Sequence, residues 1–431
     1  MQRVEKTIKI NNISEFESKL LAWAQNFDII CWLNGNNYPQ KHSNYDAVLA
    51  VGAQTKLSTN YKNAFQQLKT YQSNCNDYIF GYLGYDLKND TENLTSNNFD
   101  GLHFPDLFFF QPKKIFFIKN NTLKISYLKD YKEEIKSDLN AIKSFKDKKS
   151  KSENEIKIKL RIHEDAYFQK LNSILNHIHR GDVYEVNFCQ EFYAENAVIN
   201  PLKVFQNLNE ISKPPFAAFF KFKNNYLLSA SPERYIKKEG NLVISQPIKG
   251  TAKRAKIANK DKILIQELAQ NSKERAENIM IVDLVRNDLS TVALKGTVKV
   301  DELCKVYTFK QVHQLISTIS CTVENVHPVT ILKKTFPMGS MTGAPKIATM
   351  KIIEKLEETK RGLYSGAVGY ITPNNDFDFN VIIRSILYNS ENQYVSYSVG
   401  GAITAKSIPE NEYEECLLKA KAMKQVLLNN K

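Results

Sequence analysis

The fold class is decided by one stretch of sequence, Phe216-Ala217-Ala218-Phe219-Phe220-Lys221-Phe222-Lys223-Asn224-Asn225-Tyr226-Leu227-Leu228-Ser229-Ala230. Two apolar and aromatic runs, 216–222 and 226–230, flank three polar residues, a pattern that predicts two strands joined by a short turn. Strands joined in this way are antiparallel, whereas parallel strands need a long crossover. The stretch therefore favours an α+β protein with a largely antiparallel sheet over a doubly wound α/β protein.

The same reading extends outward along the chain. Further strands are predicted at 183–192, 366–372, 381–388 and 394–399, and in the N-terminal part at 106–110 and 114–118. Helical periodicity predicts helices at 163–179, 260–270, 273–289, 344–360 and 410–428. No internal repeat is visible. Helices and strands thus alternate through the second half of the chain.

Composition narrows the class of protein. The 431 residues are 42% hydrophobic and 11% aromatic, as in globular proteins. The six cysteines are scattered without the spacing of a zinc site or a disulfide framework. The N-terminus shows no apolar signal segment, and no run is long enough to span a bilayer. We therefore expect a cytoplasmic protein that does not enter a membrane.

The positive net charge raises the question of nucleic-acid binding. The formal net charge is +13, but most of the lysines are dispersed. The one dense cluster, Lys143 to Lys151, is interrupted by acidic residues and alternates with no aromatic residues apart from Phe145, which is typical of a solvated linker. We predict no nucleic-acid partner. The cluster divides the chain into an N-terminal α+β region (1–142), a Lys/Ser-rich linker (143–160) and a catalytic region (161–431).

Lys249 is the residue most suggestive of chemistry. It lies in Pro247-Ile248-Lys249-Gly250-Thr251, after the apolar run 242–244, so the sequence predicts the end of a strand turning into a loop. A lysine at such a place can contact an anion, or attack carbon if it is dehydrated and deprotonated. An ordinary surface lysine is the alternative, and the surrounding sequence argues against it.

Five ordered blocks carry a resemblance to a known family. They are Ser231-Pro232-Glu233-Arg234, Pro247-Ile248-Lys249-Gly250-Thr251, Ala276-Glu277-Asn278-Ile279-Met280-Ile281-Val282-Asp283-Leu284-Val285-Arg286-Asn287-Asp288, Pro337-Met338-Gly339-Ser340-Met341-Thr342-Gly343-Ala344-Pro345-Lys346 and Arg361-Gly362-Leu363-Tyr364-Ser365-Gly366. In this order they resemble the chorismate-utilising enzymes, which include component I of anthranilate synthase and of aminodeoxychorismate synthase. The resemblance covers about residues 165 to 425. It implies two facing, largely antiparallel sheets with helices packed outside.

The resemblance also implies a reaction. Lysine in the Pro-Ile-Lys-Gly-Thr block is typical of aminodeoxychorismate synthases, whereas anthranilate synthases usually carry alanine there. We therefore expect amination of chorismate by ammonia to 4-amino-4-deoxychorismate, on the route to p-aminobenzoate and folate, with anthranilate formation as the alternative. The chain has no Gly-x-Cys-x-Gly block, so a separate glutamine amidotransferase subunit is expected to supply the ammonia.

Roles for individual residues follow from the resemblance. Glu233 is expected to act as the general acid, Lys249 as a nucleophile made neutral by desolvation, and His313 to lie beside the ring. Glu277 and Glu415 are expected to bind Mg²⁺, which favours a few carboxylates plus waters. The expected substrate contacts are Gly250, Thr251, Tyr364, Arg384, Gly400 and Gly401.

Glu412 and Glu185 are not among these expected site residues. Glu412 lies three residues before Glu415, and we interpret it as part of a solvated helix face. Glu185 stands where the family commonly has glutamine, or lysine in members that activate water. A glutamate cannot replace that lysine, which argues against isochorismate or salicylate synthesis. Whether Glu185 contacts the substrate is left open.

Overall fold

The computed structural model describes residues 2–38, 41–145 and 156–428. Its strands form one hydrogen-bonded sheet that bends into two facing layers. Every pairing between the named strands is antiparallel, which confirms the α+β class predicted from the hairpin at 216–230. That hairpin is the pair β9–β10, in which Phe222 is opposite Asn225.

The first layer contains, in order of pairing, β4 (Ile79–Leu83), β17 (Ala367–Ile371), β18 (Phe377–Val381), β11 (Arg234–Glu239), β12 (Leu242–Gln246) and β15 (Val312–Thr322), with β13 (Ile248–Lys253) and β14 (Lys299–Thr308) also paired to β15. The second contains β2 (Ile29–Asn34), β9 (Phe216–Phe222), β10 (Asn225–Ser231), β19 (Ser385–Asn389), β20 (Tyr394–Thr404) and β8 (Glu185–Ala194), with β7 (Lys159–Leu160) and β16 (Gly343–Ala344) paired to β8.

Two long strands join the layers. β3 (Ala47–Thr59) pairs with β2 of the second layer, and β5 (Leu107–Lys119) pairs with β4 of the first, while β3 and β5 pair with each other. Their register shifts between Ala53 and Thr55, next to Gly52 at φ +66°. An irregularity of this kind bends a strand and increases its twist, which lets one continuous sheet supply both layers.

The core lies between the layers. Ring centroids of Tyr82 on β4 and Phe220 on β9 are 5.3 Å apart, edge to face, and both side chains are buried. Alternate residues of a strand point into this space, and many of the residues between them are buried on the opposite face, as in β5. Burial of both faces explains the runs of Phe, Tyr and Val in the sequence. The remaining strands, β1 (Arg3–Lys9) and β6 (Thr122–Leu128), extend the sheet beyond β5.

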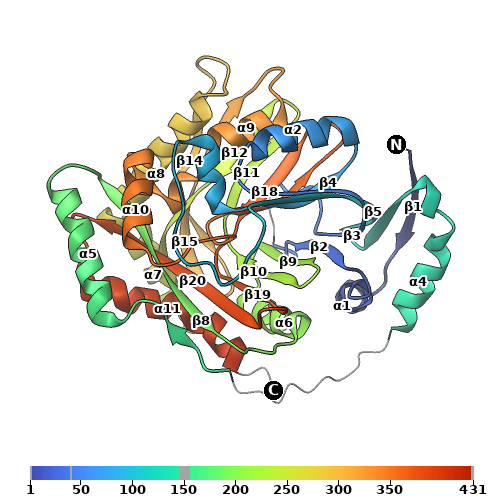
Figure 1. The fold of residues 1–431 in the computed structure, drawn as a ribbon, viewed down its shortest axis with the longest axis horizontal. Coiled ribbons are helices and arrows are strands. Elements are labelled where there is room, and N and C mark those ends of the chain that lie inside the picture. The colour runs from blue at the N-terminus through green and yellow to red at the C-terminus, as the bar shows by residue number, and fades with distance from the viewer. Residues whose placement is uncertain (1, 39–40, 146–155, 429–431) are drawn as a thin grey trace.

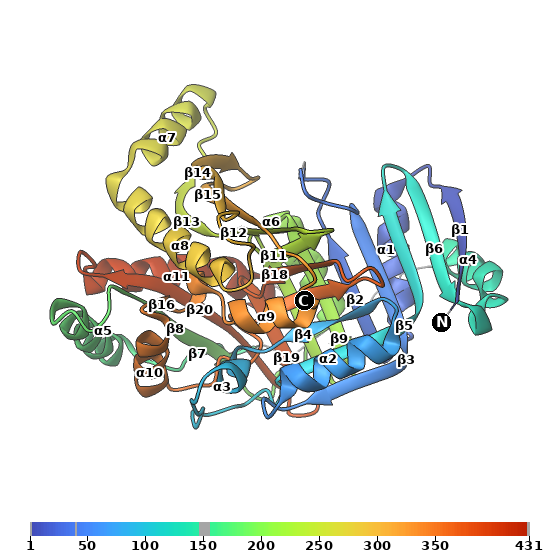
Figure 2. The same cartoon turned by 90° about the horizontal axis from the view of Figure 1, so that it is seen from above.

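The helices pack on the outer faces and ends of the layers (Figures 1 and 2). They are α1 (Ile13–Ala24), α2 (Ala64–Cys75), α3 (Lys88–Thr91), α4 (Glu134–Ser144), α5 (Glu164–His179), α6 (Pro201–Ser212), α7 (Ala258–Gln270), α8 (Ser272–Ser290), α9 (Pro328–Thr335), α10 (Lys346–Leu356) and α11 (Pro409–Leu428). Helix α8 packs against β13, β14 and β15, and α11 packs against β20. These two helices therefore pack on different layers of the sheet. None of the described helices has the length and apolar content needed to cross a bilayer.

The N-terminal region shares the sheet with the rest of the chain. β2 pairs with β9, and β4 pairs with β17, so strands from before residue 142 lie inside both layers. Of the predicted linker, 146–155 lie outside the described residues. On either side of that gap, α4 ends at Ser144, Ile156 is buried, and β7 begins at Lys159.

Several predicted elements are wrong in their limits. The predicted strands at 106–110 and 114–118 are one strand, β5. The predicted helix at 344–360 begins only at Lys346, because Gly343 and Ala344 pair with β8, and it ends at Leu356. The predicted strand at 381–388 is broken, since the chain leaves the first layer after Val381 and enters the second at Ser385. Arg384, at φ +53°, lies in this crossing.

Candidate active site

Strand β12 ends at Gln246, as the sequence predicted, but the chain enters β13 at Ile248, so Lys249 lies on a strand and the predicted loop is wrong. β13 pairs with β15, but the register shifts between Ile248 and Thr251. Gly250 has φ +93°, a conformation that favours glycine, and completes this bulge. The bulge re-aims Lys249 away from the regular alternation of the strand, toward β8 of the second layer.

Glu185 on β8 receives the Lys249 side chain. Lys249 Nζ donates to Glu185 Oε1 at 2.9 Å, and the side chains are 11% and 0% exposed, respectively. Burial acts to lower the pKa of Lys249, but the Glu185, Glu277 and Glu233 carboxylates together outweigh burial, and the pKa is held above its ordinary value. In the free protein the pKa of Lys249 is therefore shifted in the direction opposite to the one expected for a lysine made neutral by desolvation.

Glu233 follows β10, and its carboxyl group is buried. Ser340 Oγ, on the short 3₁₀ helix Gly339–Met341, donates to Glu233 Oε1 at 2.7 Å. Burial raises the pKa of Glu233 to about 7, with the Ser340 hydrogen bond and the Lys249 charge opposing the rise. A carboxyl group with this pKa is suited to donate a proton near neutral pH.

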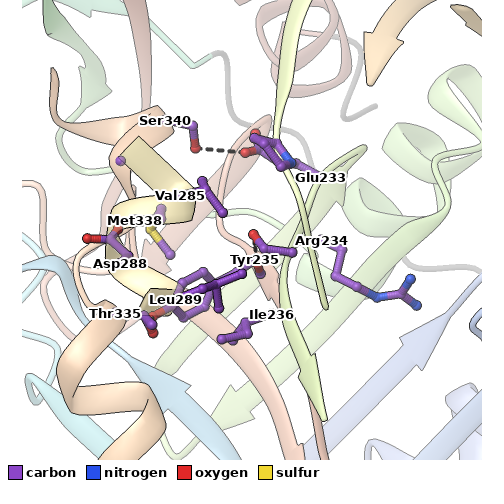
Figure 3. Close-up of a pocket in the computed structure, with 13 residues that line it drawn as sticks. Glu233, Arg234, Tyr235, Ile236, Val285, Asp288, Leu289, Thr335, Met338 and Ser340 are labelled. Carbon is purple, nitrogen blue, oxygen red and sulfur yellow. Dashed lines mark hydrogen bonds between the residues drawn. The ribbon is translucent and has the colours of Figure 1, made fainter. Parts of the chain in front are cut away.

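A small cavity of about 20 Å³ lies behind Glu233 (Figure 3). In this view Glu233 points to Ser340, whereas the neighbouring Arg234 side chain points away. Arg234 bonds to Asp378 and Gln246 instead. The adjacent residues of the Ser-Pro-Glu-Arg block thus differ in role. Glu233 faces the site, and Arg234 links β11 to β18 and β12 by hydrogen bonds.

Four carboxylates converge from α8 and α11. Glu277 of α8 and Glu412 of α11 each lie 3.9 Å from Lys273 Nζ, so the two helices meet at this ammonium. Burial, with Glu415 next among the causes, raises the pKa of Glu274, while burial raises the pKa of Glu277 to about 7. Clustered carboxyl groups with raised pKa values indicate a place that favours a cation.

The interpretation of Glu412 as solvated is wrong, and Glu415 is the more open of the two. Glu412 is 5% exposed and burial raises its pKa, because the first turn of α11 packs against the end of β20. The Glu415 side chain is 49% exposed and bonds to Lys419 at 2.5 Å. Burial acts to raise the pKa of Glu415, but Lys419 more than offsets it and the pKa is lowered.

The donor set fits Mg²⁺. Glu277 Oε1 is buried, accepts no hydrogen bond from the described residues and has Lys273 Nζ only at 3.9 Å, so this oxygen retains the capacity to bind a cation. Within the described ranges, no three His, Cys, Asp or Glu residues are already grouped as metal ligands. Mg²⁺ needs only one or two protein carboxylates when waters and a substrate anion complete its shell. Glu277 and Glu415, with Glu412 beside them, suit that requirement.

Arg384 and Tyr364 lie together beside α11. Arg384 Nη1 donates to the Lys419 carbonyl oxygen at 3.1 Å, and burial lowers the pKa of Arg384. The Tyr364 hydroxyl accepts from Cys189 Sγ at 3.8 Å. Because burial is costly for a guanidinium that lacks an anion, this pair is a candidate for binding a substrate carboxylate.

The two glycines expected to contact substrate on β20 differ in how closely other atoms approach them. A Cβ on Gly400 would lie 2.5 Å from Asn187 Oδ1 and 2.7 Å from Cys189 Sγ, so tight packing against β8 requires glycine there. A Cβ on Gly401 would make only ordinary contact, 3.4 Å from Glu412 Oε2. Thr251 is exposed and lies 3.5 Å from Gln314 Nε2. Gly250 and Thr251 thus lie on β13 of the first layer, and Gly400 and Gly401 lie on β20 of the second.

His313 is not part of this group. Its ring is fully buried on β15, with Nε2 2.9 Å from Asp261 Oδ1 of α7 and Nδ1 2.9 Å from Thr308 Oγ1 of β14. Both ring nitrogens are therefore engaged in holding α7 and β14 to β15. Side chains alternate along a strand, and it is the next residue, Gln314, that approaches Thr251.

Sequence reasoning missed Ser340 and Glu274 as members of the site, whereas the i,i+4 pair of Glu415 and Lys419 was predicted and is present. Glu274 precedes Glu277 by three residues, so helical spacing already placed both on one face. Ser340 stands in a recognised block, but its bond to Glu233 joins residues 107 positions apart. No local pattern could show that contact.

The chain belongs to the family of chorismate binding enzymes, which it matches over residues 29–425. It is 32% identical over 364 residues to "Aminodeoxychorismate synthase component 1" of Bacillus subtilis, covering 80% of this chain and 76% of that protein. It is 39% identical over 283 residues to "Probable aminodeoxychorismate synthase, chloroplastic" of Oryza sativa, covering 64% of this chain but 31% of that longer protein.

Solved structures support the fold. Anthranilate synthase component I of Streptococcus pneumoniae superposes with a TM-score of 0.76 at 23% identity, covering 90% of this chain and 95% of that one. MenF, the menaquinone-specific isochorismate synthase of Escherichia coli, gives a TM-score of 0.78 at 16% identity, covering 99% and 94%. At these identities the likeness shows the two-layered fold alone.

Proposed function

We propose that this chain is the chorismate-aminating component of an aminodeoxychorismate synthase, which converts chorismate and ammonia to 4-amino-4-deoxychorismate. The observation that carries the proposal is the bulge in β13, which aims the Lys249 amine into the same site as the Glu233 carboxyl group. A nucleophile and an acid with a pKa of about 7 are what displacement of a ring hydroxyl needs. The names of the Bacillus and rice relatives support the same activity.

The chemistry divides among the chain's own groups. Glu233, held by Ser340, donates its proton to the departing C4 hydroxyl. Lys249 adds to C2 of the ring and is expelled when ammonia enters at C4. Arg384 and Tyr364 orient the enolpyruvyl carboxylate. A Mg²⁺ ion bound by Glu277 and Glu415 would neutralise the ring carboxylate.

The ammonia source is proposed to be a separate glutamine amidotransferase. None of the six cysteines lies in a Gly-x-Cys-x-Gly block, and the Bacillus relative is named as component 1. The described cysteines are free thiols, which fits the reducing cytoplasm as the proposed compartment. The product would feed synthesis of p-aminobenzoate and folate.

The test is to incubate the pure chain with chorismate, Mg²⁺ and an ammonium salt, and to identify the product by mass. Aminodeoxychorismate is the expected product, and glutamine should not replace ammonium. Release of anthranilate, which is fluorescent and has lost the enolpyruvyl group, would overturn the assignment in favour of anthranilate synthesis. Turnover with glutamine by the chain alone would contradict the separate glutaminase.

A further inference from the structure

Glu185 is a buried carboxylate. Among the described residues, its side chain is hydrogen-bonded to Lys249, the nucleophile of the proposed reaction. Its side chain is 0% exposed, and Oε1 accepts from Lys249 Nζ at 2.9 Å. Its second oxygen, Oε2, is buried without a hydrogen-bond partner among the described residues. A structural ion pair would normally use both oxygens, because each unpaired oxygen adds to the cost of burial.

Several other carboxyl groups face Lys249 from the elements around it. They are Glu233 after β10, Glu274 and Glu277 on α8, and Glu415 on α11. Glu233 is held by Ser340, and the α8 and α11 carboxylates gather around Lys273 and Lys419. Within the described part of the chain, Glu185 alone accepts a hydrogen bond from Lys249 Nζ.

The backbone around Glu185 is held rigidly. Glu185 is paired with Ala344 of β16, and Tyr184 N donates to the Ala344 carbonyl oxygen at 2.7 Å. A Cβ on Gly343 would lie 2.1 Å from the Glu185 carbonyl oxygen, so glycine permits this close approach. The carboxylate is therefore fixed in place before substrate arrives, as a proton acceptor must be.

We propose that Glu185 is the base that removes the proton from the Lys249 ammonium and returns it when the lysine is released. This inference rests on the proposed function, because it concerns how the lysine nucleophile of that reaction becomes neutral. The nearby carboxylates hold the pKa of Lys249 above its ordinary value, and Nζ donates to Glu185, so a neutral amine must be generated within the site. A carboxylate already hydrogen-bonded to the ammonium provides the shortest route.

The proton and electron balance is complete without another reactant. One proton passes from Nζ to Oε1, and the electron pair left on Nζ forms a bond to C2. The ring π electrons shift, the C4–O bond breaks, and the hydroxyl leaves as water with the proton of Glu233. Ammonia then bonds to C4 and passes one proton to the Glu233 carboxylate. The C2–Nζ bond breaks with its pair returning to Nζ, which recovers its proton from Glu185.

The central test is Glu185→Gln, which keeps the shape and the hydrogen-bond acceptor but cannot take a proton. With chorismate present and ammonia withheld, we would follow the adduct on the Lys249 peptide by rapid quenching and mass spectrometry. The expected result is a fall of about 10²–10⁴-fold in the rate of adduct formation at pH 7, with unchanged chorismate binding. The rate in the variant should rise about tenfold for each pH unit, while that of the parent changes little.

Glu191→Gln is the matched control. Glu191 is another buried carboxylate of β8, but it bonds to Arg161 and Tyr394. This variant should lose stability without changing the pH dependence of adduct formation. A Glu185→Gln protein that forms the adduct at the parent's rate and with its pH profile would overturn the proposal, whereas a parent that forms no aminodeoxychorismate would overturn the function itself.

A second measurement covers the case in which Glu185→Gln does not fold. Glu185→Asp retains a carboxylate but shortens the side chain, so adduct formation should fall less than in any folded variant that lacks a carboxylate, such as Glu185→Ala. Equal rates of adduct formation in Glu185→Asp and Glu185→Ala would show that no carboxylate at this position takes the lysine proton and would refute the proposal.

Discussion

Replacing Lys249 by methionine should destabilise the protein as well as stop the reaction. Methionine has nearly the volume of the lysine stem, so the change removes the charge without opening a large cavity. The substitution leaves Glu185, which is 0% exposed, without its 2.9 Å partner. Removing one member of a buried ion pair costs about 3–5 kcal/mol, because the remaining charge is desolvated and unpaired. We expect a loss of that size at pH 8.

The cost arises in the folded state. Without the ammonium, the folded variant buries the Glu185 carboxylate without a partner charge, whereas the unfolded chain exposes that carboxylate to water.

Urea denaturation of the parent, Lys249→Met, Glu185→Gln and the double variant forms the assay. The double variant should regain most of the stability that Lys249→Met loses, since no charge remains buried. All variants that lack Lys249 should make no aminodeoxychorismate. The reasoning is refuted if Lys249→Met is as stable as the parent at pH 8, or if the double variant is no more stable than Lys249→Met.

Three further predictions test other parts of the site. Chelation should abolish turnover, and Glu277→Gln or Glu415→Gln should each raise the Mg²⁺ concentration needed for half-maximal rate, measured by metal titration; variants that behave like the parent would make these residues mere helix-face carboxylates. Because burial raises the pKa of Glu233 to about 7, kcat/KM for chorismate at constant free ammonia should fall as pH rises above 7, and Glu233→Gln should cost about 10²–10⁴-fold; a flat profile would remove its role as acid. Gly400→Ala should cost about 1–3 kcal/mol in urea denaturation, because its Cβ would lie 2.5 Å from Asn187 Oδ1; an unchanged midpoint would show that β8 yields at no cost.

Local sequence was sufficient for the elements and the family. The hairpin at 216–230 predicted antiparallel pairing, and helices α5, α7, α8 and α11 begin and end within two residues of their predicted limits. The reason is physical, because hydrophobic periodicity and turn chemistry act over a few residues. The same locality let the ordered blocks identify the chorismate binding enzymes.

What only the tertiary structure decided is the environment of each functional side chain. The pKa of Lys249 is raised despite burial, because Glu185, 64 residues away in sequence, accepts a hydrogen bond from Lys249 Nζ and the Glu277 and Glu233 carboxylates add to its effect. His313 faces α7 rather than the site, because the direction of a strand side chain depends on register, and a one-residue difference reverses it. Glu412 is buried because α11 packs on β20. Burial, register and pairing between distant strands are properties of the folded chain, so a residue's identity determined the chemistry available to it and only the fold determined its charge and its partners.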